Sequence, residues 1–485
     1  MTLDPANWDD TRAVGRAMID DMMTWLETVR ERPTWTSVPA DVKARLVGAP
    51  IPYAGASLEA VYEAFKRDVL PYPTGNIHPR FWGWVMGTGT PTGVLAEMLA
   101  ATMNPHLAGY DQSAALIERQ VLSWLIELMG FPADASGVLV SGGTEANING
   151  LMAARVAKAG WDVRAEGLRA GPPLTVYGSV ETHSWILTAC ETMGLGRDAF
   201  RAIPVGGDYR IDIAACRARI AADLAAGMRP FAIVGNAGTV GTGATDELNA
   251  LRDLADDFGL WLHIDGAFGA LAAWTDSRDI VAGQSRADSL AFDLHKWGYM
   301  PYEVGVALTR SATAQTDAYK PAGQGVPAYL KSAQGGIAVE TTYFADRGLQ
   351  LSRGFRALKV WMSMKEQGVD RIAGAIQRNI DQARFLGDLV TAHPDLRLLA
   401  PVTLNIVCFR YAPAGLRETA LNPLNQAILV ALQDRGIAVP SQTVLQDRFA
   451  IRVCIANHRS VDADFEVLVR AVAEIGAELA TERVG

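Results

Sequence analysis

Apolar residues recur at helical spacing near the N-terminus. Between residues 13 and 31 they recur every three or four positions among charged ones, at Val14, Met18, Met22, Trp25 and Val29. This spacing predicts an amphipathic helix, and a second one follows over residues 58–70. A proline-marked stretch over residues 33–52 separates the two. Such helices cannot bury both faces alone, so residues 1–78 are predicted to form a helical arm that packs on a partner subunit.

From about residue 80 the pattern changes to short apolar runs separated by helical segments. The runs span residues 137–140, 174–177, 231–234, 260–264 and 289–292. Strands of this length that alternate with helices are typical of a doubly wound, mostly parallel sheet. We therefore expect residues 79–375 to form a large α/β domain.

A second set of apolar runs lies near the C-terminus. A long amphipathic stretch over residues 353–386 leads to apolar runs within residues 396–409 and 449–455. Their length is that of β-strands. Residues 376–485 are therefore predicted to form a small C-terminal α/β domain.

Charge and composition narrow the class of protein. Lys and Arg number 44 against 53 Asp and Glu, for a net charge of -9, and no basic run argues for nucleic acid or an anionic membrane as a partner. We also expect no membrane span, because no apolar segment is long enough, and no secretory signal, because the first twenty residues carry four aspartates. The four cysteines show no paired spacing, which argues against a disulfide framework or a thiolate zinc site. A cytoplasmic protein without a bound metal is expected.

Candidate chemistry follows the apolar runs, because open α/β sheets bind ligands at the carboxyl ends of their strands. Residues 138–147 pass through Ser141-Gly142-Gly143-Thr144 into a helix, whose first amides could hold a phosphate together with the Thr144 hydroxyl. A plain strand–helix turn is an equal alternative. Asp265 ends another run, and a buried carboxylate there requires a partner such as a protonated pyridine nitrogen. Its alternative is a helix cap.

A lysine and a histidine complete the candidate site. Lys296 follows the run at residues 289–292. Either its aliphatic chain is buried while its ammonium reaches solvent, or its amine forms a Schiff base. The order of a glycine-rich helix start, Asp265, and a lysine 31 residues later favours the Schiff base. His183 follows the run at residues 174–177 and could stack on a planar cofactor or act as a base, with an ordinary surface histidine as the alternative.

These segments closely resemble the group II pyridoxal-phosphate-dependent amino-acid decarboxylases over nearly the whole chain. The family signature is a Ser, a hydrophobic residue, five positions, the Schiff-base Lys and two hydrophobic or Gly positions, which match Ser289, Leu290, Lys296, Trp297 and Gly298. Similar segments are residues 78–83, 141–147, 261–267 and 355–359. The resemblance implies the fold type I of pyridoxal-phosphate enzymes, pyridoxal 5'-phosphate as the cofactor, and a homodimer with the active site at its interface.

The resemblance also implies a role for individual residues. Lys296 matches the Schiff-base lysine, Asp265 the partner of the pyridine nitrogen, His183 the ring that stacks on the cofactor, and Tyr329 the loop residue that protonates the substrate carbon. Further cofactor contacts implied in this way are Gly143, Thr144, Thr239, Ala267, His295 and, from a neighbouring subunit, Ser352. The substrate pocket implied is lined by Phe81, Trp82, Trp84, His106 and Tyr110.

The activity implied is the decarboxylation of an L-amino acid to its amine, and the aromatic lining favours an aromatic substrate. Asn76 and His106 depart from the aromatic-specific members and keep a non-aromatic substrate open. Asp293 stands where animal members often have Asn, which places an acid near the phosphate. Three alternatives remain open. The first is decarboxylation followed by oxidative deamination to an aldehyde, and the second is amino transfer. The third is a protein that binds the cofactor without catalysis.

Overall fold

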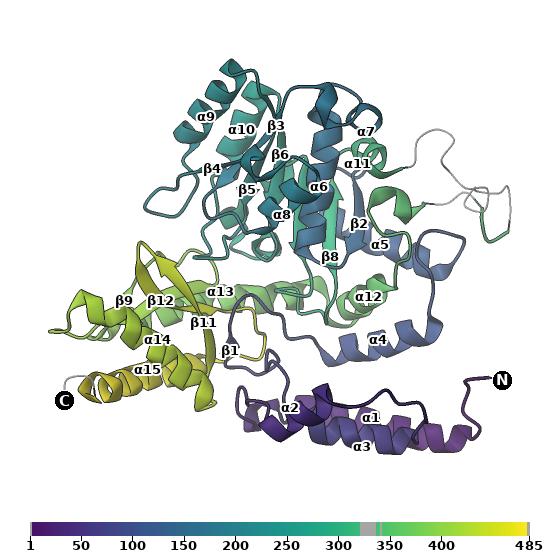
Figure 1. Ribbon diagram of the computed structural model, residues 1–485, viewed down its shortest axis with the longest axis vertical. Coiled ribbons are helices and arrows are strands. Elements are labelled where there is room, and N and C mark those ends of the chain that lie inside the picture. The colour runs from purple at the N-terminus through teal and green to yellow at the C-terminus, as the bar shows by residue number, and fades with distance from the viewer. Residues whose placement is uncertain (1, 321–335, 340–341, 483–485) are drawn as a thin grey trace. The chain divides into compact units, whose positions relative to one another are not determined.

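The computed structural model describes residues 2–320, 336–339 and 342–482 (Figure 1). Tyr329 lies outside these described residues. The chain divides into two compact units. Unit 1 comprises Met1–Trp84, Phe385–Leu399 and Cys408–Gly485, and unit 2 comprises Val85–Arg384 and Ala400–Val407.

Unit 2 is built on a seven-stranded sheet in the order β2-β8-β7-β6-β5-β3-β4 (Figure 1). Its strands are β2 Ser136–Val140, β3 Leu174–Ser179, β4 Phe200–Ile203, β5 Arg229–Asn236, β6 Trp261–Asp265, β7 Ser289–Asp293 and β8 Gly305–Thr309. From β4 to β7 neighbouring strands are parallel, whereas β8 is antiparallel to both β7 and β2. The prediction of a mostly parallel α/β sheet is therefore confirmed, although β4 and β8 were not predicted.

Helices connect these strands. They are α4 Pro91–Met103, α5 Ser113–Leu128, α6 Gly143–Lys158, α7 Val163–Glu166, α8 Trp185–Thr192, α9 Ile213–Ala225, α10 Leu248–Phe258, α11 Ala312–Tyr319, α12 Arg356–Gln367 and α13 Val369–Ala392, which continues into unit 1. Helix α6 packs along β5 to β8, while α9 and α10 pack on β5 and its neighbours. The long amphipathic stretch predicted over residues 353–386 thus forms two helices, α12 and α13.

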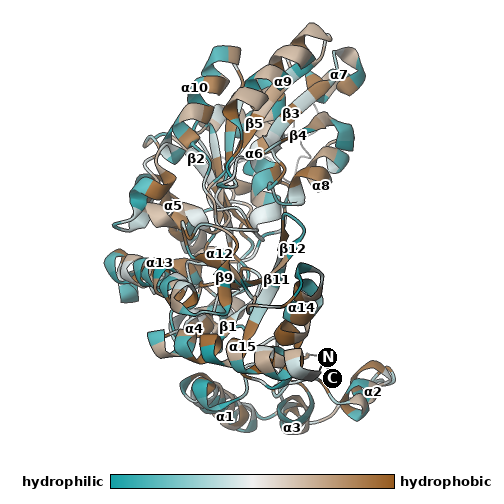
Figure 2. Cartoon of the chain, turned by 90° about the vertical axis from the view of Figure 1, so that its left-hand side faces the viewer, coloured by the Kyte–Doolittle hydropathy of each residue, from teal (hydrophilic) through white to brown (hydrophobic). Residues whose placement is uncertain are grey.

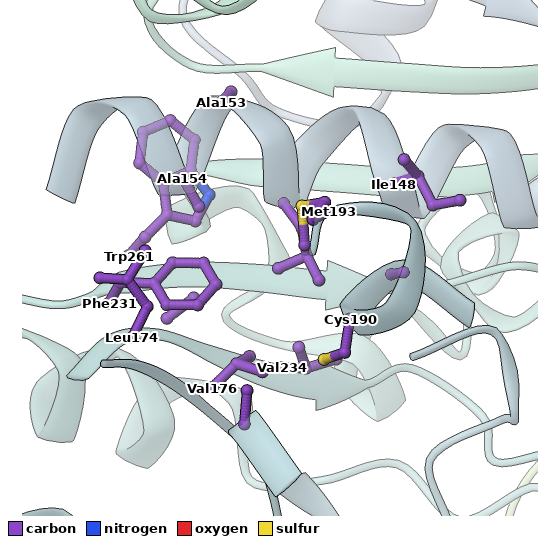
Figure 3. Packing of buried hydrophobic residues seen from close by; sticks show 14 of the residues in the cluster. Ile148, Ala153, Ala154, Leu174, Val176, Cys190, Met193, Phe231, Val234 and Trp261 are labelled. Carbon is purple, nitrogen blue, oxygen red and sulfur yellow. The ribbon is translucent and has the colours of Figure 1, made fainter. Parts of the chain in front are cut away.

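A close-packed core lies between α6, α8 and the parallel strands (Figure 3). Phe231 and Val234 of β5 and Trp261 of β6 are almost fully buried, and they share one buried cluster with the small residues Ala153 and Ala154 of α6. Burial of each large apolar side chain stabilises the fold by roughly 1.5–3 kcal/mol. This core fixes the strands whose carboxyl ends carry the candidate site.

Unit 1 contains the N-terminal helices and a five-stranded sheet in the order β1-β11-β12-β10-β9. Its strands are β1 Phe81–Trp82, β9 Leu396–Leu398, β10 Ile406–Tyr411 (in unit 1 from Cys408 onward), β11 Val439–Leu445 and β12 Arg448–Cys454. Its helices are α1 Trp8–Glu27, α2 Ala40–Val47, α3 Leu58–Asp68, α14 Glu418–Asp434 and α15 Asp462–Glu482. The helices predicted near residues 13–31 and 58–70 are confirmed as α1 and α3, and the predicted C-terminal strands as β9, β10 and β12.

Helix α1 has no buried residue in this single chain. It begins after Asn7, whose side chain accepts a hydrogen bond from the Asp9 amide at 3.0 Å. In Figure 2, both α1 and α3 carry hydrophobic segments, in brown, and hydrophilic segments, in teal, as expected for amphipathic helices. Exposed apolar side chains on these two helices include Trp8, Ile19, Val61 and Phe65.

The four cysteines, Cys190, Cys216, Cys408 and Cys454, are buried and free. Within the described ranges, no cluster of His, Cys, Asp or Glu has the arrangement of a metal site. Across the same residues, no helix combines the length and apolar character that a membrane crossing requires.

Candidate active site

Lys296 lies in the turn that follows β7, and its ammonium contacts a buried acid. The distance from Lys296 Nζ to Asp293 Oδ2 is 2.8 Å, and the lysine side chain keeps 23% of its surface exposed. Burial lowers the pKa of Lys296, but the charge and hydrogen bond of Asp293, together with the charges of Asp265 and Tyr302, act in the opposite direction, and the pKa is raised overall. Lys296 is therefore a cation in the structure as it stands.

Asp265 ends β6, the neighbour of β7, and two hydrogen bonds hold its carboxylate. The Trp185 indole donates to Oδ2 at 2.6 Å, and the Ala267 amide donates to Oδ1 at 3.1 Å. The carboxylate is buried, and its charge contributes to the raised pKa of Lys296 and partly opposes the lowering of the pKa of His183. Asp265, Lys296 and His183 are thus brought close enough to interact electrostatically.

The start of α6 forms a glycine-lined cradle beside Asp293. A Cβ on Gly143 would lie 2.8 Å from Asp293 Oδ2, and a Cβ on Gly305 would lie 2.6 Å from the Gly142 Cα, so side chains cannot be accommodated there. Glu145 secures the turn, because its carboxylate accepts hydrogen bonds from the Ser141 amide and hydroxyl at 3.1 and 2.7 Å. Backbone amides at the start of such a helix bind anions well.

His183 and Thr239 lie on loops after β3 and β5. His183 is exposed in this chain, and its Nδ1 accepts a hydrogen bond from the Trp185 amide at 3.2 Å, so in the neutral ring the proton is on Nε2. Desolvation of the part of the ring that faces the protein lowers the pKa of His183, which favours this neutral form. Thr239 is buried, with its hydroxyl 3.2 Å from that of Thr242.

His295 is fixed beside the cradle by its neighbours. Its Nδ1 accepts a hydrogen bond from the Val304 amide at 3.1 Å, and its ring packs on Tyr302 with 4.3 Å between centroids. The backbone of His295 and Lys296 also packs against Gly87, where a Cβ would lie 2.1 Å from the His295 carbonyl oxygen. Only glycine permits this close approach, so Gly87 positions the lysine turn.

A separate aromatic cluster contains two of the predicted pocket residues. His106 and Tyr110 lie 6.0 Å apart by ring centroids, and Tyr110 meets Tyr343 edge to face at 6.4 Å. A fully buried ion pair underlies this segment: Arg353 donates to Glu118 Oε2 at 3.1 Å, to the Leu107 carbonyl at 2.8 Å and to the Leu139 carbonyl at 2.7 Å. Ser352, next to Arg353, is exposed.

The other predicted pocket residues belong to unit 1. Trp82 is buried there, stacks on Phe465 with 4.9 Å between centroids and donates to the Ser460 hydroxyl at 3.1 Å. Phe81 is also buried, whereas Trp84 is 54% exposed. The structure thus gathers Lys296, Asp265, His183, His295, Gly143, Thr144, Thr239 and Ala267 at one edge of the unit 2 sheet, and it places Phe81, Trp82 and Trp84 in the other unit.

Comparison with known proteins identifies the family. The model of the pyridoxal-dependent decarboxylase conserved domain matches residues 39–412. The chain therefore belongs to the pyridoxal-dependent decarboxylases, and it is a carboxy-lyase that uses pyridoxal 5'-phosphate. This confirms the resemblance stated from the sequence.

Individual relatives agree with this assignment. The chain is 31% identical over 475 residues to an aromatic-L-amino-acid decarboxylase of Bacillus atrophaeus, which covers 97% of this chain and 96% of the relative. It is 26% identical over 468 residues to phenylacetaldehyde synthase of Arabidopsis thaliana, with 93% of each chain covered. The crystal structure of Oryza sativa TDC with PLP and tryptamine has a TM-score of 0.89 at 26% identity, covering 99% of this chain and 100% of that one.

The residues of this site fit the cofactor. The cradle at the start of α6 is lined by glycines, so its backbone amides can approach a phosphate closely, while Asp265 offers a carboxylate that could pair with a ring nitrogen and Lys296 offers an amine. Trp185 and Gly87 were not identified from the sequence as site residues. The cluster of glycines at Gly87, Gly89 and Gly93 is a sequence signal that could have indicated Gly87. Nothing in the local sequence pattern indicates Trp185.

Proposed function

We propose that the enzyme decarboxylates an aromatic L-amino acid to the amine and carbon dioxide, with Lys296 as the lysine that binds the cofactor through a Schiff base. The observation that carries this proposal is the convergence of Lys296, Asp265 and His183 with the glycine cradle at the carboxyl edge of β6 and β7. Clusters of interacting ionisable groups of this kind mark functional sites.

When bound, the cofactor supplies an electron sink for the electron pair left as carbon dioxide departs. Asp265 would hold a proton on the ring nitrogen, since the Trp185 and Ala267 hydrogen bonds fix its carboxylate. The amides of Gly143 and Thr144 would hold the phosphate with His295 beside them, while Thr239 and Ala267 would contact the cofactor ring. Ser352 is proposed to contact the cofactor of a neighbouring subunit.

Proton delivery to the substrate carbon is assigned to Tyr329, supported by His183. His183 Nε2 carries the proton of the neutral ring, because Nδ1 is occupied by the Trp185 amide. A neutral imidazole can stack on a planar ring without adding charge to it. A tyrosine hydroxyl within hydrogen-bond reach of the carbon would then serve as the general acid.

An aromatic substrate is supported by the likeness to the Bacillus atrophaeus enzyme. With the twenty common amino acids and Dopa, we expect amine and carbon dioxide in equal amounts, and the highest kcat/KM for an aromatic side chain. Peroxide and aldehyde measured in the same assay test oxidative deamination, which the likeness to phenylacetaldehyde synthase raises. A preference for a polar or acidic amino acid would overturn the substrate proposal, and stoichiometric aldehyde would overturn simple decarboxylation.

Trp185→Phe is expected to lower kcat/KM roughly 10- to 100-fold, because a hydrogen bond to a charged group contributes about 1.5–3 kcal/mol. Phe keeps the aromatic bulk but removes the indole N–H that donates to Asp265 at 2.6 Å. Steady-state kinetics with the preferred substrate measure the effect. Trp161→Phe is the control, since that indole donates to the Gly167 carbonyl and should leave kcat/KM unchanged. Equal losses in both variants would show that Trp185 does not act through Asp265.

Proposals for the oligomeric state, the domain bounds and the cellular location of the enzyme rest on separate observations. We propose a homodimer in which the helical arm of residues 1–78 packs on the partner subunit, and this is supported by the unburied α1 and by the exposed apolar residues of α1 and α3. The large and small α/β domains are proposed to span residues 79–375 and 376–485. A cytoplasmic location is supported by the four free cysteines.

A further inference from the structure

A buried carboxylate depends on Lys296 as its charged partner. Asp293 Oδ2 lies 2.8 Å from Lys296 Nζ, and only 1% of the Asp293 side chain is exposed. Oδ1 has no hydrogen-bond partner among the described residues. Because a buried carboxylate is costly without a cation nearby, the contact with the Lys296 ammonium offsets much of the cost of burying Asp293.

The carboxylate stands in the cradle itself. A Cβ on Gly143 would lie 2.8 Å from Asp293 Oδ2, and one on Gly305 would lie 2.8 Å from Oδ1. The start of α6 favours negative charge, since its first amides lack partners within the helix. Asp293 therefore occupies, in this structure, the neighbourhood in which a phosphate would be held.

Other ionisable groups surround this pair. On the same turn, His295 Nε2 lies 3.7 Å from Asp293 Oδ2, and Tyr302 packs on the His295 ring. From β6, the charge of Asp265 acts on Lys296 in the same direction as Asp293 but less strongly, and Lys359 of α12 acts on His295. Where α6 and β8 meet the carboxylate, they present glycines. Among these charged groups, Asp293 has the strongest effect on the pKa of Lys296.

We propose that Asp293 is a positioning residue that keeps Lys296 as a paired ammonium in the cofactor-free enzyme, so that the lysine reacts with an aldehyde only once this pair opens. The inference rests on Lys296 being the cofactor lysine, as proposed above. In the reaction, the ammonium first releases a proton to solvent. The free amine then forms a bond to the aldehyde carbon, and the carbonyl oxygen leaves as water.

The test uses cofactor-free full-length enzyme and pyridoxal, which has the aldehyde but no phosphate. The rate of imine formation is followed by absorbance across a range of pH. For the wild type we expect the rate to rise about tenfold per pH unit through about pH 10, because a paired lysine titrates above its ordinary value of about 10.4. In Asp293→Asn, burial is opposed only by the weaker effects of Asp265 and Tyr302, so the midpoint should fall by at least about one pH unit and the rate near neutral pH should rise about tenfold or more.

Asp288→Asn is the matched control. Asp288 precedes the opposite end of β7, where it pairs with Arg252 at 2.7 Å, so its removal should leave the wild-type pH profile in place. An unchanged midpoint in Asp293→Asn, or a wild-type rate that levels off below about pH 9, would overturn the proposal. If Asp293→Asn does not fold, the pH profile of the wild-type enzyme still tests the proposal. Borohydride trapping followed by peptide mapping distinguishes failure of the Asp293 proposal from failure of the proposed function, since an adduct on a lysine other than Lys296 overturns the proposed function itself.

Discussion

Lys296→Ala is expected to abolish amine and carbon dioxide formation, with a loss of several orders of magnitude in turnover. Alanine has no amine that could bond to the cofactor, and no other lysine is expected to reach the same position between Asp293 and Asp265. Substrate-dependent release of carbon dioxide measures the loss. The absorption spectrum of the purified variant, mixed with pyridoxal 5'-phosphate, shows whether the imine still forms.

The control for this prediction is Lys365→Ala. Lys365 is exposed on α12, where its ammonium lies 4.9 Å from the Trp361 ring centroid, outside the candidate site. This variant should keep wild-type turnover and spectrum. Full activity in Lys296→Ala, or an unaltered imine spectrum, would remove Lys296 from the mechanism and with it the proposed function of this site.

The parallel part of the fold could be predicted from local sequence because each buried strand is a short apolar run. β3, β5, β6 and β7 coincide with such runs, since strands covered on both faces need apolar side chains throughout. β4 was missed because its residues Phe200-Arg201-Ala202-Ile203 are only partly buried at the sheet edge. β1 has two residues, which is too short for any periodicity.

The candidate site was predictable where chemistry follows a strand directly. Asp265, Lys296 and His183 stand just after β6, β7 and β3, so the strand-end rule locates them without knowledge of the fold. Their supporting partners were not predictable in this way. Trp185 donates to Asp265 across 80 positions of sequence, and only the pairing of strands in the sheet brings the two together.

The same holds for the buried ion pair of Glu118 and Arg353, which are 235 positions apart in the sequence. Arg353→Met is expected to lower the free energy of unfolding by about 3–5 kcal/mol, because it leaves the Glu118 charge buried without its partner. It also removes the donors to the Leu107 and Leu139 carbonyls. Since Leu107 lies beside His106, a loss of kcat/KM should accompany the loss of stability. Urea unfolding at fixed protein concentration measures the first effect.

A second substitution separates charge burial from packing. In the double variant Arg353→Met with Glu118→Leu no charge remains buried, so the double variant should be more stable than Arg353→Met alone. Arg384→Met is the surface control, because its partner Asp381 and Arg384 itself are both more than half exposed, and its cost should be below about 1 kcal/mol. If Arg353→Met were no more costly than Arg384→Met, the ion pair would not be what holds the segments of His106 and Ser352 in place.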